Sequence, residues 1–288
     1  MTLTSSAYER LIEAVREAAR EVILPRFRNL DTAEIATKSG PDDLVTIADK
    51  EAEARITEAA RACLPGALVI GEEAVSENEP LLATLGTAEC AVVIDPVDGT
   101  WNFARGLTTF GVILAVTVRG ETVFGLLYDP VCDDWIVAER GAGTRFCRPG
   151  QADRPIATQD GLSAARGCFL PLNMYAATTR GALMKALAGR ARMLSLRCSC
   201  HEYRLLAQGH VRFSLSGSLK PWDHAAGALA VQEAGGVVAM LDGTPYRPAE
   251  TGGVLLAAGD ADTAREAAEM LRPCFRAYAG RLQDRNPN

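Results

Sequence analysis

Two short apolar runs in this chain each end at acidic residues. The run at residues 67–71 is followed by Glu72, and the run at residues 90–94 is followed by Asp95 and then by Asp98. Short apolar runs bounded by polar residues are typical of buried strands. Because an unpaired charge is costly to bury, a strand that leads directly into carboxylates needs a partner for them at its end. The pattern predicts a mixed helix and sheet fold with a ligand site at strand ends.

Helical periodicity lies on both sides of a loop near the start of the chain. Residues 5–29 carry apolar side chains at helical spacing after Ser5 and Ser6, which are possible N-caps. Residues 46–64 form a second predicted helix, in which Thr46 and Asp49 have the spacing of a capping pair. The intervening "KSGPDDLVT" is rich in helix breakers and is predicted to be a loop. We expect these two helices to cover a sheet.

That sheet is predicted to continue as an antiparallel meander. Strand-like runs at residues 110–118, 122–128 and 134–138 are separated by turn signals. The Gly- and Pro-rich segment 141–161 is the predicted boundary between two lobes, an N-terminal lobe at residues 1–150 and a C-terminal lobe at residues 151–288. Helix and strand patterns alternate beyond it. The predicted helices are 179–189, 200–209, 222–236 and 261–282, the last interrupted at Pro273, and the predicted strands are 191–196, 211–217, 237–243 and 252–260.

Composition narrows the class of protein. The 288 residues are 48% hydrophobic, enough for a substantial core. No apolar stretch is long enough to span a bilayer, and "MTLTSSAYER" lacks the basic start and apolar core of a signal peptide. Eight dispersed cysteines favour a reducing compartment, so we expect a cytoplasmic protein without a membrane partner. The net charge of −6 and pI of 5.3 argue against nucleic acid as a partner, and an anionic substrate would need a bound cation.

Five carboxylates lie where predicted elements begin or end: Asp49, Glu72, Asp95, Asp98 and Asp223. Taken singly, each has a structural explanation, because acids are common in first helical turns and in tight turns. If they converge, they cannot all stay ionised without compensation. Mg²⁺ takes oxygen ligands and leaves room for a substrate phosphate. The set therefore predicts a magnesium site with Asp95 bridging paired ions.

Phosphate chemistry is also suggested by "DGT" at residues 98–100. Gly99 allows close approach of the backbone to an anion, and Thr100 precedes a possible short helix with exposed amides. By itself the tripeptide is a weak signal, since Asp-Gly is a common turn dipeptide.

Three motifs together resemble those of the inositol monophosphatase family, which are Mg²⁺-dependent and often Li⁺-sensitive phosphatases. They are "GEE" at residues 71–73, "DPVDGTWNF" at 95–103 and "PWDHAAGALAVQEAGG" at 221–236. The resemblance extends from "KSGPDDLVTIAD" to "GGVLLAAGD". It implies a layered α/β (α+β) sandwich with the inositol monophosphatase/fructose-bisphosphatase-like fold, two packed lobes and a homodimer.

The resemblance also implies a role for each site residue. A first ion would be held by Glu72, Asp95 and the Val97 carbonyl. A second would be held by Asp95, Asp98 and Asp223, and a third by Glu72 with water. Asp49, Thr100 and Glu72 would orient and activate a water. Lys38 lies in the matching loop near the phosphate, which the amides of Gly99 and Thr100 would cradle. Asp98 and Asp223 would also contact the substrate. We therefore expect Mg²⁺, with two to three ions per site, and a small phosphate ester as substrate.

The sequence departs from the family where the substrate's leaving group is expected. Arg197-Cys198-Ser199-Cys200 replaces a small Gly-Thr-Ala-like stretch, so Arg197 and Ser199 are candidate pocket residues. Arg197 would either face a second anionic group or pair with a nearby carboxylate. Ser216 stands where related enzymes have the acid that holds inositol hydroxyls. These changes leave open an inositol monophosphate, histidinol phosphate or a 3′-phosphonucleotide as substrate, and a binding role in bacterial transcription as another class of function.

Other residues receive structural interpretations. "CSCH" at residues 198–201 lacks a second Cys or His pair at zinc-finger spacing, so its cysteines are predicted to be core or pocket-wall residues. His224 is predicted to face solvent in the first turn of its helix. Trp101 and Phe103 are predicted to pack in the core, and contact with a substrate is the alternative for both.

Overall fold

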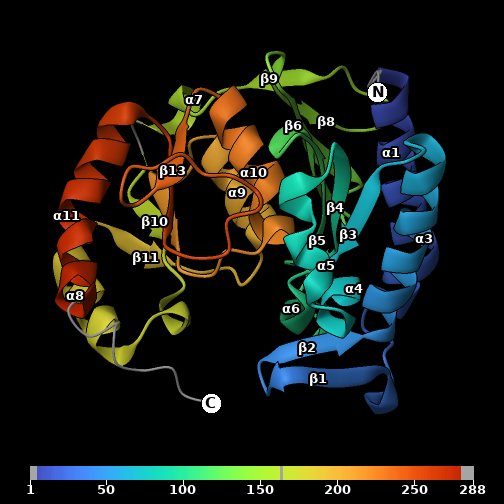
Figure 1. Ribbon diagram of the computed structural model, residues 1–288, viewed down its shortest axis with the longest axis horizontal. Coiled ribbons are helices and arrows are strands. Elements are labelled where there is room, and N and C mark those ends of the chain that lie inside the picture. Colours follow the sequence, from blue (N-terminus) through green and yellow to red (C-terminus); the bar gives the residue numbers. More distant parts are fainter. Residues whose placement is uncertain (1–4, 163–164, 280–288) are drawn as a thin grey trace.

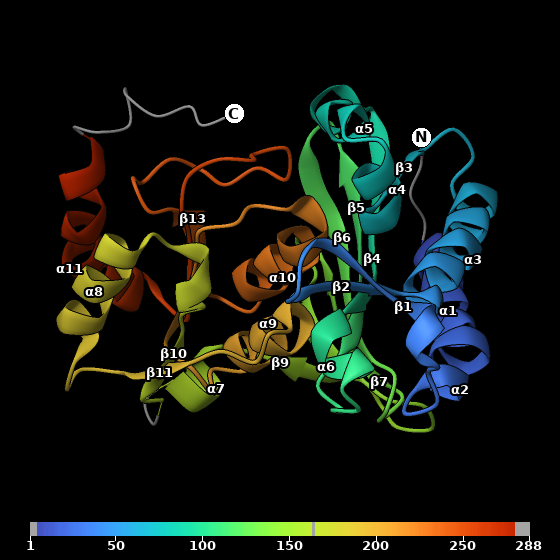
Figure 2. The ribbon, with the colours of Figure 1, turned by 90° about the horizontal axis from the view of Figure 1, so that it is seen from below.

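Five alternating layers of helix and sheet build the molecule (Figure 1). A computed structural model describes residues 5–162 and 165–279. From one side to the other, the layers are a pair of helices, a large sheet, a central pair of helices, a smaller sheet and an outer pair of helices, and the view turned by 90° shows the same succession (Figure 2). The predicted layered α/β sandwich is confirmed.

The first sheet has seven strands and is antiparallel apart from one edge. β3 and β4 are parallel, and each later pair is antiparallel, as the meander prediction requires. In spatial order the strands are β3 (Leu68–Gly71), β4 (Cys90–Asp98), β5 (Gly111–Val118), β6 (Glu121–Asp129), β7 (Asp134–Glu139), β8 (Gly143–Cys147) and β9 (Arg154–Ile156).

The predicted first pair of helices covers the outer face of this sheet. α1 (Ser5–Ala18) continues through η1 (Ala19–Ile23), a wider π-helical stretch, into α2 (Leu24–Arg26), and α3 (Ile47–Cys63) packs beside it. The first helix is therefore three residues shorter than predicted. Pro25 has no backbone N–H and its ring crowds the preceding turn, which explains a widened stretch just before it. Apolar side chains of both helices and β4 to β6 form one core cluster.

The second sheet has five strands between the central and the outer helices. Its order is β11 (Arg192–Leu194), β10 (Gly167–Phe169), β12 (Phe213–Ser216), β14 (Leu255–Ala258) and β13 (Val237–Met240). The central layer consists of α9 (Ser199–Ala207) and α10 (Pro221–Glu233), and the outer layer of α8 (Ala177–Leu187) and α11 (Ala261–Ala279). The shorter elements are α4 (Glu72–Glu77), α5 (Pro80–Ala83), α6 (Thr100–Ala104), α7 (Gln159–Leu162), η2 (Thr32–Glu34), η3 (Leu85–Thr87) and η4 (Leu172–Met174).

The central helix α10 touches the first sheet with no side chain between the two backbones. A Cβ at Gly125 of β6 would lie 2.8 Å from the Ala226 carbonyl oxygen and 2.9 Å from its Cα. Such distances are shorter than real Cβ contacts, so only glycine permits this approach. The contact sets the depth at which α10, and Asp223 in its first turn, lies against the sheet.

Two predictions about secondary structure are wrong in detail. "KSGPDDLVT" is not a loop: β1 (Ile35–Gly40) and β2 (Asp43–Thr46) form a separate antiparallel hairpin around Pro41 and Asp42, beside α6 (Figure 2). Segment 141–161, the predicted boundary between lobes, contains β8 and β9, which extend the first sheet. The division into lobes at residues 150 and 151 stays a prediction.

The last helix is also not interrupted at Pro273, which lies inside α11. Buried Ala267, Ala268 and Leu271 anchor this helix against the second sheet and α8, and that packing outweighs the loss of one backbone hydrogen bond. The predicted end of the helix at residue 282 lies outside the described residues.

Candidate metal and phosphate site

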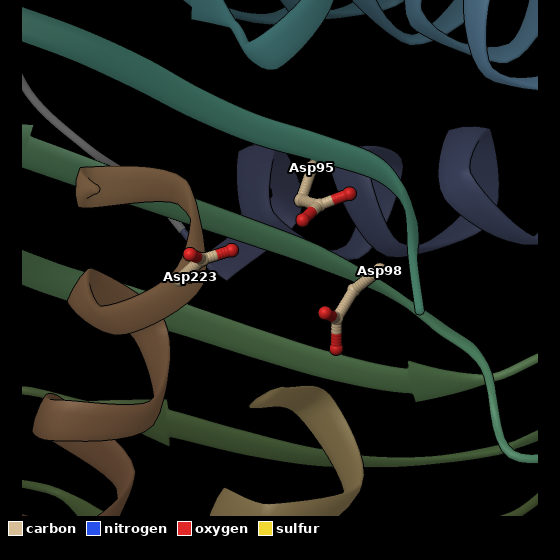
Figure 3. A group of neighbouring side chains, drawn as sticks. All are labelled: Asp95, Asp98 and Asp223. Atoms are coloured by element: carbon tan, nitrogen blue, oxygen red, sulfur yellow. The ribbon is translucent and has the colours of Figure 1, made fainter. Parts of the chain in front are cut away.

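Asp95, Asp98 and Asp223 converge at the end of β4. Each offers a carboxylate oxygen, and these oxygens all lie within 4.8 Å of one another, with Asp95 and Asp98 coming from β4 and Asp223 from α10 (Figure 3). Asp95 is 2% exposed and Asp98 is 7% exposed. Buried like charges at this distance suit a divalent cation.

An irregularity in β4 turns both of its aspartates to one side. Residues three apart on a regular strand point to opposite faces. Here Asp95 pairs with Ile113 and Asp98 with Gly111, so β4 carries one more residue than β5 over this stretch. A bulge of this kind re-aims a side chain. The "DPVD" spacing therefore becomes a convergent pair only because the strand is irregular there.

Burial and mutual repulsion raise the pKa values of the three aspartates. For Asp95 the causes are burial first, and then the charges of Glu72, Asp98 and Asp223, and its pKa is raised well above the ordinary value. Burial also raises the pKa of Asp223, followed by the charges of Asp98 and Glu72. Asp95 Oδ1 is buried and has no hydrogen-bond partner among the described residues. A cation would relieve both the repulsion and the unpaired oxygen, so the donor set fits a metal.

Glu72 begins α4 beside this cluster and is paired with a lysine. Lys38 Nζ on β1 lies 3.0 Å from Glu72 Oε1 and 2.6 Å from Glu73 Oε1. All three side chains are at most 15% exposed. The carboxylate of Glu53 on α3 accepts hydrogen bonds from the amides of Glu73 and Ala74, which fixes the start of α4. Lys38 therefore neutralises the acids at this edge of the site.

Asp49 and Thr100 form the contact that the resemblance implied. Thr100 Oγ1 lies 3.0 Å from Asp49 Oδ1 and 3.0 Å from the Val97 carbonyl oxygen. Asp49 Oδ2 accepts from the backbone and the hydroxyl of Thr46, and Thr46 Oγ1 accepts from the Ala48 amide, so the predicted cap of α3 is confirmed. Burial raises the pKa of Asp49 to about 7, although both contacts with Thr46 act against the shift.

Asp98 has a second role that the sequence did not suggest. Its Oδ2 accepts from the Cys200 amide at 2.5 Å and from the Cys198 thiol at 3.0 Å, and the Ser199 amide is a further donor. The carboxylate therefore caps the N-terminus of α9 from a distant part of the chain. Gly99 beside it has φ +85°, and a Cβ there would lie 3.0 Å from the Thr109 carbonyl oxygen.

A cavity of about 250 Å³ joins these residues to the "RCSC" stretch. Asp49 and Lys38 are not among its lining residues but contact residues that are. Arg197, which the sequence left between two alternatives, lies with Nη2 3.4 Å from Asp42 Oδ1. The predicted residues that line it are Glu72, Asp95, Val97, Asp98, Gly99, Thr100, Arg197, Ser199 and Asp223.

Sequence reasoning missed several lining residues. Trp101 lines the cavity, so its predicted packing in the core is wrong and the alternative, contact with a substrate, remains, whereas Phe103 is buried as predicted. Asn173 and Met174 also line the cavity but belong to no motif. The other missed lining residues are Asp42, Asp43, Leu44, Pro171, Ser195 and Glu202.

The prediction for His224 is wrong. Its ring is buried, with Nδ1 3.0 Å from the Tyr203 hydroxyl and Nε2 2.7 Å from the Ser218 carbonyl oxygen. The small Gly227 on the next turn and the packing of α10 between two sheets leave this helix without a solvent face at His224. Ser216 Oγ lies 3.0 Å from the same carbonyl oxygen and is not among the cavity-lining residues.

The cysteines of "CSCH" are buried, as predicted. Cys200 Sγ lies 3.6 Å from the Tyr128 carbonyl oxygen, and His201 Nε2 lies 3.0 Å from the Phe110 carbonyl oxygen. These side chains point to different partners and do not form a zinc site within the part of the chain that the structure describes.

The layered fold and the acid cluster at the end of β4 define a class of protein. The chain belongs to the inositol monophosphatase family, whose model matches residues 4–276. It is a phosphatase, and its family is metal-dependent, typically with Mg²⁺. Within residues 5–162 and 165–279, no helix has the length and apolar character needed to cross a bilayer.

Individual relatives differ in their names. The chain is 33% identical over 236 residues to the Nus factor SuhB of Escherichia coli (strain K12), covering 81% of this chain and 84% of that protein. It is 28% identical over 244 residues to the inositol-1-monophosphatase of Bacillus subtilis (strain 168), covering 84% and 88%. The solved IMPase of Thermotoga maritima superposes with a TM-score of 0.75 at 24% identity, covering 94% of this chain and 98% of that one.

Proposed function

We propose that this protein hydrolyses a small phosphate monoester with the help of Mg²⁺ held by its acidic cluster. The observation that carries the proposal is the convergence of Asp95, Asp98 and Asp223 within 4.8 Å, with a buried Asp95 oxygen that has no partner among the described residues. Divalent ions bound there would make a water more acidic and stabilise negative charge on the leaving oxygen. The substrate class we favour is a phosphorylated small metabolite such as an inositol monophosphate.

Two to three ions are proposed per site, with ligands shared between them. Asp95 is proposed as the ligand shared between the ions, because the charges of Glu72, Asp98 and Asp223 all act on its carboxylate. Glu72 and the Val97 carbonyl would complete one set of protein ligands, and Asp98 and Asp223 the other. All five positions line the same cavity, so no rearrangement of the backbone is needed.

Asp49 and Thr100 are proposed to orient the attacking water together with Glu72. The Thr100 hydroxyl already lies between Asp49 Oδ1 and the Val97 carbonyl oxygen. A hydroxyl held by a carboxylate acceptor can in turn accept a proton from water. The amides of Gly99 and Thr100 would bind the phosphate oxygens, assisted by the positive φ of Gly99. Lys38 would approach the phosphate after leaving Glu72 and Glu73.

The proposal is tested by measuring inorganic phosphate released from a panel of esters. The panel contains inositol phosphates, sugar phosphates, histidinol phosphate and 3′-phosphonucleotides, each with and without Mg²⁺. Asp95→Asn should abolish Mg²⁺-dependent release from every ester. Asp262→Asn is the matched control, because Asp262 is 75% exposed on α11, and it should retain activity. Activity that survives Asp95→Asn contradicts the mechanism.

The identity of the ester separates the proposed substrates. Hydrolysis of histidinol phosphate or a 3′-phosphonucleotide in preference to inositol phosphates would favour the alternative enzymes. We also propose a homodimer with Li⁺-sensitive activity in the cytoplasm, on the family resemblance.

A second candidate function is a binding role in bacterial transcription. It is favoured by the name Nus factor, which relatives 31–33% identical to this chain carry. The metal carboxylates are not required for such a role. The test is whether a chain with Asp95→Asn, inactive as a phosphatase, still restores the phenotype of a strain that lacks the protein. Restoration supports the binding role, and failure with a folded variant supports the enzyme.

A further inference from the structure

Arg197 has an unusual backbone conformation, and two side chains hold its neighbour Leu196. The φ of Arg197 is +53°, in the left-handed region that residues other than glycine rarely adopt. Asn102 Nδ2 of α6 donates to the Leu196 carbonyl at 2.8 Å, and Glu202 Oε1 of α9 accepts from the Leu196 amide at 2.7 Å. Asn102 Nδ2 also donates to the Thr109 carbonyl at 2.7 Å. A strained residue fixed in this way is commonly found at functional sites.

The guanidinium of Arg197 lies over an aromatic ring of the cavity. Its Cζ is 4.1 Å from the centroid of the Trp101 ring, and both residues line the cavity that holds the acid cluster. Stacking on a ring fixes the guanidinium plane and leaves its N–H groups free to donate from the edge. The side chain is 41% exposed, so these donors are accessible from solvent.

The hydrogen bonds that Arg197 makes to Asp42 are weak. Nη2 lies 3.4 Å from both the carbonyl oxygen and Oδ1 of Asp42, which is long for a charge-assisted hydrogen bond. The Asp42 side chain is 76% exposed in the turn of the β1–β2 hairpin. An exposed ion pair of this kind contributes little to stability. A better-placed anion can therefore replace the Asp42 carboxylate.

Arg197 differs in charge from the other ionisable residues that line the cavity. Of the described residues that line the cavity, Arg197 carries the one cationic side chain, whereas seven are acidic: Asp42, Asp43, Glu72, Asp95, Asp98, Glu202 and Asp223. The acids suit cations and the phosphate that those cations attract. A cation on a separate, more exposed part of the wall has no role in that chemistry and suits a different anionic group on the same molecule.

We propose that Arg197, stacked on Trp101, is a specificity site for phosphate esters whose leaving group carries a second anionic group, either a carboxylate or a second phosphate. This inference rests on the proposed phosphatase function. The second anionic group displaces Asp42 and accepts hydrogen bonds from the edge of the guanidinium. Trp101 and the clamp on Leu196 keep that edge in place.

The test compares esters that differ only in the second anionic group. Glycerol 1-phosphate and 3-phosphoglycerate differ by a carboxylate, and fructose 1-phosphate and fructose 1,6-bisphosphate differ by a phosphate. In the unaltered protein, kcat/KM should be higher for the member with the second anionic group by about 10- to 100-fold, which is the range for a hydrogen bond to a charged group. A larger preference in the first pair identifies a carboxylate, and in the second pair a phosphate.

Two substitutions remove the guanidinium in different ways. Arg197→Gln keeps a long polar side chain, and Arg197→Gly relieves the left-handed backbone, so a folding defect in the first does not affect the second. Both should bring the kcat/KM ratio within each pair close to unity. Arg105→Gln is the matched control, because Arg105 also lies over Trp101, at 5.6 Å, but is not a cavity-lining residue. It should leave the ratio unchanged.

Asp42→Asn tests the displacement itself and should have the opposite effect. Removing the competing carboxylate should lower KM for the ester with the second anionic group by about 2- to 5-fold relative to its partner. The inference is overturned if Arg197→Gln and Arg197→Gly leave the kcat/KM ratio within each pair unchanged. It is also overturned if Asp42→Asn raises KM for the ester with the second anionic group. Either result leaves the phosphatase function standing. If no ester is hydrolysed, the proposed function fails, and the ratio of dissociation constants within each pair, from calorimetry, then tests the Arg197 site by itself.

Discussion

The carboxylate of Asp98 accepts a 2.5 Å hydrogen bond from the amide of Cys200, which lies at the start of α9. The same side chain belongs to the acid cluster with Asp95 and Asp223. The cluster is therefore connected to the central helix layer twice, through Asp98 to α9 and through Asp223 to α10. Substitutions within it should have different effects on stability, although all of them should impair metal binding.

Asp95→Asn should stabilise the metal-free protein, and Asp98→Ala should destabilise it. The first removes a buried carboxylate that is repelled by its neighbours, and should raise the free energy of unfolding. The second removes the cap of α9 and should lower that free energy by about 1–2 kcal/mol. Urea unfolding in EDTA measures both. If both variants change the free energy of unfolding in the same direction, the different roles of Asp95 and Asp98 are contradicted.

Lys38→Gln should reduce the Mg²⁺ concentration needed to stabilise the protein. Lys38 neutralises Glu72 and Glu73, and a cation that binds Glu72 must compete with its ammonium group. Thermal unfolding at a series of Mg²⁺ concentrations gives the midpoint of stabilisation. We expect a lower midpoint for the variant. Lys50→Gln is the control, since Lys50 pairs with exposed Glu77 at the surface, and it should leave the midpoint unchanged.

Gly125→Ala should impair both stability and activity from a position that lies outside the cavity. The new Cβ would meet the Ala226 backbone at 2.8–2.9 Å and push α10 away from the sheet, together with Asp223. Overpacking of this kind costs about 1–3 kcal/mol. Gly181→Ala in α8 is the matched control, because no atom lies within 4 Å of the new Cβ, and it should stabilise by about 0.5–1 kcal/mol. Unfolding and Mg²⁺-dependent phosphate release measure the two effects.

The buried His224 should make the protein less stable in mild acid. Burial lowers its pKa from 6.5 to about 4, so between these values the unfolded chain binds a proton that the folded protein does not. The contribution of His224 to the free energy of unfolding is complete above pH 6.5. It is lost as the pH falls toward 4, by roughly 3 kcal/mol. His224→Gln should flatten this part of the pH dependence in urea unfolding. Parallel curves for the two proteins would contradict the prediction.

The carboxylates of the acid cluster could be predicted from the sequence because their positions follow from local patterns. Asp95 ends an apolar run, and Asp223 opens a helix whose sequence is a recognisable motif. The bond between Asp98 and Cys200 could not be predicted, since it joins residues about a hundred positions apart through the packing of α9 on the sheet. The same holds for the clamp of Asn102 and Glu202 on Leu196.

Secondary structure was hardest to predict where pairing or packing overrides composition. The strands of the β1–β2 hairpin carry polar residues such as Thr37 and Lys38 and show no apolar run, so only their mutual pairing makes them strands. Pro273 would end an isolated helix, but the packing of α11 carries the helix past it. His224 follows an acid in a first turn, a place that is usually exposed, and it is buried because α10 lies between two sheets.

The placement of α10 in the central layer has a consequence for how this chain can evolve. Most of its side chains are buried between two sheets, and Gly125 fixes its depth, so Asp223 stands on a part of the molecule that tolerates little change. Arg197 and Asp42 instead belong to connections between elements, and their side chains are 41% and 76% exposed. A descendant of this protein could exchange those two residues and acquire a new substrate while inheriting the old reaction unaltered.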